Sequence, residues 1–380
     1  MALRFKSAMN SEHIHSSALS AAPESRFARA TSVLDQAIAA RDFPGCAFGV
    51  LAGGATVLQG ARGRFTDEDT APEATAETVY DIASLTKVVA TTAAVMLLHQ
   101  RGQLDLETPL GELLPGFVVG RAQGDRARQV KLLHLLAHNS GLPGYVEFFR
   151  TATTPPALYR ACLELPLEAD PGARVVYSDP GFILLGKALE VFTGEPLAVW
   201  VRREIFQPLD LTATDFCPAP ALRASIPPTE EDTTFRKRRI QGEVQDENAW
   251  VLAGVAGHAG LFSHVPDLLR FADEILQAAA NSGKARLFSA ATVEFFAQRQ
   301  GPQGSSRALG WDTPSENSSS GRHFSSRSIG HLGFSGCSLW LDLESQLAIV
   351  LLTNRTWPDR RNQMIRRVRP AFHDAVREAL

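Results

Sequence analysis

The sequence predicts an α+β fold: an antiparallel sheet flanked by helices, with a mainly helical lobe inserted into the sheet domain. Segments with the short apolar pattern of strands occur near both ends of the chain. The middle, from about 104 to 300, instead has apolar residues at helical spacing, separated by Pro and Gly. This order is expected when a helical lobe interrupts one sheet. With 380 residues, 44% of them apolar, the chain can bury a large core.

The N-terminal part is predicted to supply a tail, one helix and the first two strands. Residues 1–25 are polar and irregular, and we expect them to form a disordered tail. Apolar residues then recur at helical spacing from Phe27 to Ile38, before Pro44-Gly45 ends the helix. Residues 46–51 and 56–58 flank Gly53-Gly54, which indicates two strands joined by a tight turn.

A central helix is predicted from Ser84 to about Gln100, with Gly102 just beyond its end. No charged side chain occurs between Val88 and Leu98. A helix that is apolar on every side is buried on every side, so we expect this one in the middle of the molecule.

The rest of the chain supplies the helical lobe and the remaining strands. Residues 301–328 are rich in Ser and Gly, which predicts a long surface loop. We divide the domain, 26–380, into a sheet lobe of about 26–83 and 329–380 and a helical lobe of about 84–328. Helices are expected at 132–138, 182–192, 197–206, 266–280, 292–298 and from about 361, and strands at 338–343 and 347–353.

Composition excludes several classes of function. The 38 basic and 41 acidic side chains give a net charge of -3, which favours neither nucleic acid nor an anionic membrane as a partner. The apolar runs are too short to cross a bilayer, so we expect no transmembrane segment. No apolar block of an export signal precedes Pro23, which indicates a cytoplasmic protein or one whose true export signal is missing.

Metal and redox sites are not expected. Cys46, Cys162, Cys217 and Cys337 are far apart, without the close pairs of zinc or thioredoxin-like motifs, and we interpret them as small buried apolar residues. His134 and His138 have the spacing of two zinc ligands on a helix, but neither a following glutamate nor a third ligand is evident.

Ser84 and Lys87 form the strongest candidate catalytic pair. Side chains three residues apart on a helix share one face, so Lys87 can reach Ser84. A serine hydroxyl needs a base, and a lysine is a base only when its ammonium form is destabilised. We expect burial beside the uncharged helix to lower the pKa of Lys87. A capping serine with a surface lysine is the alternative, but the apolar run after Lys87 argues against it.

Two further segments carry polar groups that can complete a site. Tyr177-Ser178-Asp179 lies in a turn before a helix, where Tyr177 either relays a proton or only anchors the turn. The segment 330–336 contains three glycines and His331, and leads into a strand. Its edge can offer an N–H group to an oxyanion together with that of Ser84, the alternative being a Gly-rich strand entry with a solvent-facing histidine. His258, in the Gly-rich segment 254–260, either lines the site or is packed in the core.

These three segments resemble motifs of the serine β-lactamase and penicillin-binding protein superfamily. The resemblance is greatest to its class C-like branch of β-lactamases, DD-peptidases and esterases, over residues 30–355. Ser84-x-x-Lys87 is similar to the nucleophile motif, residues 177–179 resemble the Tyr-x-Asn element, and His331-Leu332-Gly333 resembles Lys-Thr-Gly. Weaker similarities support the same branch at 135–144, 205–216, 246–263 and 351–355.

The resemblance implies a β-lactamase/transpeptidase-like fold and a serine hydrolase that forms an acyl-enzyme on Ser84. It implies that no cofactor is needed and that the protein is periplasmic or extracellular. The implied site consists of Lys87 and Tyr177 for proton transfer, the backbone N–H groups of Ser84 and Phe334 as the oxyanion hole, and Asp179, His331, Gly333 and Ser335 for substrate binding.

The chain departs from these motifs where a substrate would be held. Asp179 replaces an asparagine, so it cannot donate to a substrate carbonyl when ionised, and it can instead keep Lys87 charged. His331 and Leu332 replace the lysine and threonine that clasp a substrate carboxylate. We therefore expect an esterase or a D-amino-acid peptidase, with a class C-type β-lactamase and a non-catalytic acyl sensor as alternatives. The substrate is a small acyl compound: an ester, a D-amino-acid peptide or a β-lactam.

Overall fold

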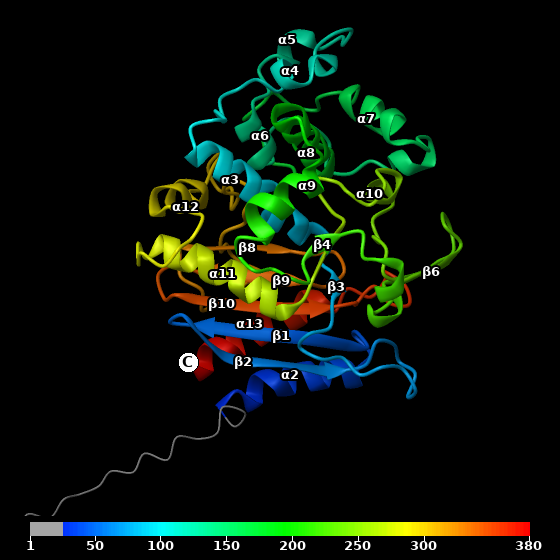
Figure 1. Ribbon diagram of the computed structural model, residues 1–380, viewed down its shortest axis with the longest axis vertical. Coiled ribbons are helices and arrows are strands. Elements are labelled where there is room, and N and C mark those ends of the chain that lie inside the picture. The colour runs from blue at the N-terminus through cyan, green and yellow to red at the C-terminus, as the bar shows by residue number, and fades with distance from the viewer. Residues whose placement is uncertain (1–25) are drawn as a thin grey trace, which may run out of the picture.

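A five-stranded antiparallel sheet joins the two ends of the chain, as the sequence predicts. The structure is a computed structural model and describes residues 26–380, so the expected tail lies outside the described residues. The strand order is β2-β1-β10-β9-β8 (Figure 1). Its strands are β1 (Gly45–Ala52), β2 (Ala55–Gly63), β8 (Ser328–Leu332), β9 (Ser338–Asp342) and β10 (Leu347–Thr353).

Helices cover both faces of this sheet. The first and last helices, α2 (Ala28–Ala39) and α13 (Ile365–Ala379), lie side by side on one face, and α11 (Val265–Ala279) packs against β1 and β10 on the other (Figure 1). Alternate strand residues therefore enter different cores. In β10, Ile349 and Leu351 belong to the core under α2 and α13, whereas Val350 and Leu352 belong to the larger core shared with the helical lobe.

The helical lobe lies beyond β8, at the other end of the molecule from α2 and α13 (Figure 1). Its helices are α4 (Leu110–Leu113), α5 (Gly124–Ala127), α6 (Leu132–Leu136), α7 (Pro155–Leu163), α8 (Asp179–Thr193), α9 (Leu197–Val201), α10 (Glu247–Val251) and α12 (Ala290–Ala297). Two small sheets accompany them: β3 (Tyr80–Asp81), β7 (Leu261–Ser263) and β4 (Asp215–Phe216), and β5 (Glu230–Asp232) with β6 (Arg238–Ile240).

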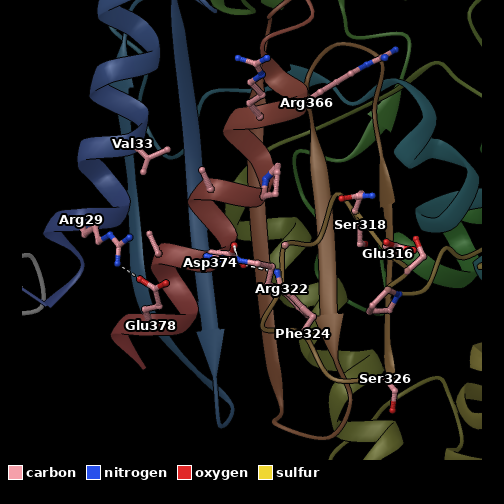
Figure 2. A pocket seen from close by; sticks show the side chains of 18 of the residues that line it. Arg29, Val33, Glu316, Ser318, Arg322, Phe324, Ser326, Arg366, Asp374 and Glu378 are labelled. Atoms are coloured by element: carbon pink, nitrogen blue, oxygen red, sulfur yellow. Dashed lines mark hydrogen bonds and ion pairs between the residues drawn. The ribbon is translucent and has the colours of Figure 1, made fainter.

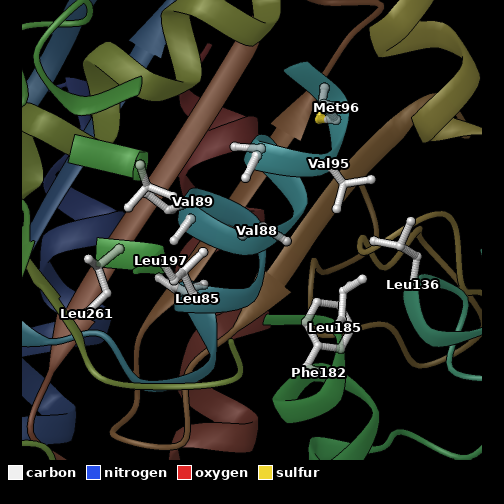
Figure 3. Close-up of a cluster of buried hydrophobic side chains, with 14 of the residues drawn as sticks. Leu85, Val88, Val89, Val95, Met96, Leu136, Phe182, Leu185, Leu197 and Leu261 are labelled. Carbon is white, nitrogen blue, oxygen red and sulfur yellow. The ribbon is translucent and has the colours of Figure 1, made fainter. Parts of the chain in front are cut away.

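The central helix is buried as predicted. All residues from 85 to 98 are buried. Figure 3 shows that Leu85, Val88 and Val95 lie among side chains of the lobe and of β7, such as Phe182 and Leu261. The helix is not uniform, because a 3-10 turn over Ala83–Leu85 is followed by a π-helical segment, Lys87–Thr92, and only then by α3 (Ala93–Gln100). Single π-helical turns inside helices often occur at functional sites.

Three local predictions need correction. The predicted loop 301–328 has no helix or strand before β8 begins at Ser328, but it is not only surface, because Leu309 and Trp311 are buried and the N–H of Gly310 donates to the carbonyl of Leu136. Cys217 is exposed, although the other three cysteines are buried. The last helix begins at Ile365 rather than near 361. Within residues 26–380, no helix has the length and apolar character needed to span a membrane.

Candidate active site

Lys87 Nζ lies at the centre of a buried hydrogen-bond cluster. It is 3.0 Å from Ser84 Oγ, 2.7 Å from Asp179 Oδ1 and 3.0 Å from the carbonyl oxygen of His258. The lysine side chain is fully buried, whereas Asp179 retains a little exposure. Each of the three ammonium hydrogens therefore has an acceptor, which is the arrangement of a charged lysine.

The pKa of Lys87 is raised, so the expectation of a lowered pKa is wrong. Burial alone lowers it and is the largest single effect, but the charge of Asp179 and the nearby Tyr177 together outweigh burial. The alternative interpretation of Asp179, that it keeps Lys87 charged, matches this direction. The sequence shows the burial of the helix, but not that a carboxylate 92 residues away lies against the ammonium.

Tyr177 is part of the turn before α8 and lies close to Lys87. The centre of its ring lies 4.9 Å from Lys87 Nζ, and burial raises the pKa of its hydroxyl above the usual value. The ring packs 4.5 Å from that of His138, whose Nδ1 accepts the N–H of Ser178. The turn itself is rigid because Ser178 caps α8 by accepting the N–H of Gly181. Tyr177 is thus both an anchor of the turn and a neighbour of the nucleophile.

His331 at the end of β8 is buried and uncharged. Its Nδ1 lies 2.8 Å from the carbonyl oxygen of Leu332, and burial, with help from the charges of Lys87 and Arg307, holds its pKa well below the ordinary value. The ring is 5.8 Å from that of Tyr177. The alternative of a solvent-facing histidine is therefore wrong, and β8 presents no cation at this position.

Ser84 and Phe334, whose backbone N–H groups are the expected oxyanion hole, both line the same cavity. Among the described residues, neither group has a hydrogen-bond acceptor. Gly333 allows the two segments to approach, because a Cβ there would lie 2.5 Å from the carbonyl oxygen of Ile82. Ser335 points elsewhere: its buried hydroxyl donates to the carbonyl oxygen of Asp81 at 2.7 Å, and it does not line the cavity.

Asp81 is a site residue that sequence reasoning missed. Its Oδ1 accepts the N–H of Ala83 at 2.8 Å, and its Oδ2 accepts that of Gln245 at 2.7 Å. Ala83 has a positive φ of 46°, a strained conformation directly before Ser84. The carboxylate of Asp81 therefore fixes the backbone just before Ser84. Its carbonyl oxygen, which accepts the Ser335 hydroxyl, fixes the segment that contains Phe334. An aspartate two residues before a turn amide is a local signal for such a bond.

A cavity of about 700 Å³ opens onto Ser84. Two exposed aromatic side chains, Tyr145 and Phe334, lie in its wall. Charged side chains from distant segments, among them Asp246 and Arg307, also line it and were not predicted. Besides Ser84, the cavity is lined by Tyr177, Asp179, His331, Leu332, Gly333 and Phe334, so most of the predicted site residues come together.

His258 contributes its backbone rather than its ring. The ring is buried, with Nε2 2.9 Å from Asp246 Oδ1, and it does not line the cavity. That contact lowers the pKa of Asp246 to about 2, even though burial alone would raise it. Within the described part of the chain, no group of three or more His, Cys, Asp or Glu side chains is arranged to hold a metal ion.

Comparison with known proteins gives the family of this chain. A family model described as Beta-lactamase matches residues 30–371. The chain belongs to the Beta-lactamase family. It is therefore a serine hydrolase of the β-lactamase and penicillin-binding protein superfamily, as the three motifs predicted.

Relatives of this family member have several activities in their names. The N-acetylmuramyl-L-alanine amidase of Bacillus subtilis (strain 168) is 32% identical over 73% of this chain and 68% of its own. A protein of Salmonella typhi named as a candidate D-alanyl-D-alanine carboxypeptidase is 30% identical over 74% and 70%.

Solved structures confirm the β-lactamase/transpeptidase-like fold. EstCE1, a hydrolase with promiscuous acyltransferase activity, superposes with a TM-score of 0.73 at 23% identity, covering 92% of this chain and 99% of its own. A class C β-lactamase from Rhodobacter sphaeroides gives 0.69 at 18% identity, over 92% and 99%. At these identities the likeness concerns the fold alone.

A second hollow, of about 930 Å³, lies away from Ser84 in this family member. It is bounded by α2, α13 and the segment 314–326 (Figure 2). Two pairs of its charged side chains contact one another, Arg29 with Glu378 and Arg322 with Asp374. None of the predicted site residues lines it.

Proposed function

We propose that the protein hydrolyses acyl compounds through an acyl-enzyme on Ser84, with Lys87 and Tyr177 transferring the protons. The observation that carries this proposal is the buried Lys87 Nζ, which lies 3.0 Å from Oγ of Ser84, a residue that lines the cavity. A lysine buried at hydrogen-bond distance from a serine is the arrangement that a serine nucleophile needs. The free N–H groups of Ser84 and Phe334 support an oxyanion hole at the same place.

Proton transfer begins with the loss of a proton from Lys87, because the pKa of this residue is raised in the resting enzyme. Neutral Lys87 takes the proton of Ser84 Oγ as the oxygen attacks the acyl carbon. Tyr177, neutral because its pKa is raised, gives its proton to the departing nitrogen or oxygen and regains one from the Lys87 ammonium. Water then releases the acyl group from Ser84 by the reverse transfers.

Asp179 has a positioning role in this scheme. As a carboxylate 2.7 Å from Lys87 Nζ, it orients the ammonium and stabilises its charge. It cannot donate a hydrogen bond to a substrate carbonyl, which the asparagine of the family motif can do.

We infer that the substrate is a small compound in which an acyl group is joined to alanine by an amide bond, as in fragments of the bacterial cell wall. Both relatives described above have names that refer to amide bonds of alanine. The cavity suits a substrate with both polar and apolar parts, because charged side chains and two exposed aromatic rings line it. Such a substrate fits the periplasmic or extracellular location that the resemblance implies.

Short-chain esters are the second candidate substrates. Leu332 has no hydroxyl, and His331 is neutral, so β8 offers nothing that clasps a carboxylate. A simple ester lacks that carboxylate and loses nothing.

Turnover of a substrate panel tests the proposal. The panel consists of N-acetylmuramyl-L-alanine, an acyl-D-alanyl-D-alanine peptide, p-nitrophenyl acetate and a chromogenic cephalosporin, each with the wild type and Ser84→Ala. We expect amide cleavage that Ser84→Ala abolishes. Turnover of the ester alone favours the esterase, a stable acyl adduct without turnover favours the acyl sensor, and turnover that survives in Ser84→Ala contradicts the mechanism.

A further inference from the structure

Arg369 is a buried cation on α13 that contacts the backbone of the loop between β8 and β9. Only 6% of the residue is exposed. Its Nε donates to the carbonyl oxygen of Gly336 at 3.0 Å, and its Nη2 donates to those of Gly333 at 2.6 Å and Cys337 at 2.9 Å. Among the described residues no carboxylate is paired with it, and burial lowers the pKa of its guanidinium. The three buried carbonyls require donors, but they do not require a charge, which is costly to bury without a countercharge.

One of these carbonyls belongs to the peptide group that contains the N–H of Phe334. The carbonyl oxygen of Gly333 and the N–H of Phe334 are the two ends of the same planar amide. That oxygen accepts two hydrogen bonds, one from Arg369 Nη2 and one from the N–H of Gly336 at 3.0 Å. Hydrogen bonds in series polarise one another, and a charged donor does so most strongly. A guanidinium at the oxygen therefore makes the N–H at the other end of the amide a stronger donor.

The peptide group before Ser84 is not bonded to a cation in this way. Its carbonyl oxygen, that of Ala83, accepts the neutral hydroxyl of Thr86 at 2.6 Å. Arg355, the other buried arginine at the loop, donates at 2.9 Å to the carbonyl oxygen of Phe334, which belongs to the following peptide group. The charge bonded to the Gly333–Phe334 amide is thus that of Arg369.

We propose that Arg369 strengthens the N–H of Phe334 as an oxyanion donor by polarising the Gly333–Phe334 peptide group. The inference rests on the function proposed above, in which negative charge develops on an oxygen at this N–H. Such an oxygen lies within about 8 Å of Arg369 Nη2, because two hydrogen bonds and one peptide group separate them. At an effective dielectric constant of about 20, a unit charge at that distance stabilises an anion about 30-fold. Because it acts through the peptide group, Arg369 is a positioning residue.

Two substitutions that keep or remove the charge separate this role from a purely structural one. In Arg369→Lys the charge remains, whereas in Arg369→Gln a neutral amide can still donate to a carbonyl. Both variants lose the simultaneous contacts of the guanidinium with three carbonyls. We expect kcat/KM for p-nitrophenyl acetate to fall about 10- to 100-fold in Arg369→Gln, somewhat less than when a whole oxyanion donor is removed. In Arg369→Lys the fall should be less than about 5-fold, because a charge is still present.

Inhibition by methylboronic acid gives a second readout that follows the oxyanion directly. The boron adds to Ser84 Oγ, the serine proton passes to Lys87, and the tetrahedral adduct carries the negative charge of the oxyanion. The inhibition constant should rise about 10- to 100-fold in Arg369→Gln and by less than about 5-fold in Arg369→Lys. Arg367→Gln removes an exposed arginine from the same helix that does not line this cavity, and it should change neither readout.

All values are expressed per folded chain, measured by circular dichroism, and Arg369→Met replaces Arg369→Gln if the latter does not fold. Losses in Arg369→Lys that equal or exceed those in the neutral variant overturn the inference, since a structural role predicts them. Unchanged values in the neutral variant, or an equal loss in Arg367→Gln, overturn it too, and in each case the acyl-enzyme mechanism remains. A wild type that neither cleaves the ester nor binds methylboronic acid contradicts the proposed function itself, and the inference with it.

Discussion

Replacing Asp179 by Asn should lower the pKa of Lys87 and free it to act as a base. The two charged atoms are 2.7 Å apart, which corresponds to about 6 kcal/mol of attraction at an effective dielectric constant of about 20. Desolvation of both groups offsets part of this, and opposite charges at such distances shift a pKa by about 1–3 units, or about 1.4–4 kcal/mol. The substitution keeps the shape of the side chain while removing this stabilisation of the ammonium.

The pH dependence of kcat/KM for p-nitrophenyl acetate measures this shift, because it reports the free enzyme. In the wild type, kcat/KM should rise with pH up to about pH 10 without a plateau, since the pKa of Lys87 is raised. In Asp179→Asn, the pH at which kcat/KM stops rising should lie about 1–3 pH units below that of the wild type, so that a plateau appears. Glu147→Gln, which removes a cavity carboxylate paired with Arg150, should leave the profile unchanged. If the rise of kcat/KM in Asp179→Asn occurs at the same pH as in the wild type, or at a higher pH, the reasoning is refuted.

Three further changes test how the site is held. Burial raises the pKa of Asp81 from 3.8 to about 6, so its contribution to stability is present below pH 4 and falls by about 3 kcal/mol as pH rises through 6. Urea unfolding at pH 4 and pH 7.5 should show this loss in the wild type but not in Asp81→Asn, and equal pH dependence contradicts it. Gly333→Ala should lower kcat more than 10-fold. The added Cβ would lie 2.5 Å from the carbonyl oxygen of Ile82 and push the Phe334 segment away. An unchanged kcat argues against this contact. Arg369→Leu should cost about 3 kcal/mol in urea unfolding, since three buried carbonyls lose their donor, and a cost below about 1 kcal/mol would exclude that role.

The parts of the fold that the sequence predicts are those with a local pattern. The strands β1 and β10 have continuous apolar runs, and the central helix has no charge between Val88 and Leu98, so burial of each follows from its own residues. The candidate site was predicted in the same way, because Ser84 and Lys87 share one helical turn. Tyr177 and His331 lie in segments whose local pattern allowed either a catalytic or a structural role, and the resemblance to the family assigned them to the site.

The parts that the sequence does not predict depend on contacts between distant segments. The direction of the pKa shift of Lys87 is decided by Asp179. The contact of Asp179 with the ammonium group cannot be read from the helical spacing around Lys87. The link between Asp81 and Ser335 spans 254 residues. Arg307 lies in a Ser- and Gly-rich segment that suggests a surface loop, yet buried neighbours such as Trp311 hold that segment against the cavity.

Trapping the acyl-enzyme tests the central claim most directly. The wild type is mixed with p-nitrophenyl acetate, quenched in acid within milliseconds to seconds, and digested for peptide mass spectrometry. We predict one acetyl group per chain, located on Ser84, that appears together with a burst of p-nitrophenol and is absent in Ser84→Ala. An acetyl group on another residue, or p-nitrophenol release by Ser84→Ala at the wild-type rate, would contradict the assignment of Ser84 as the nucleophile.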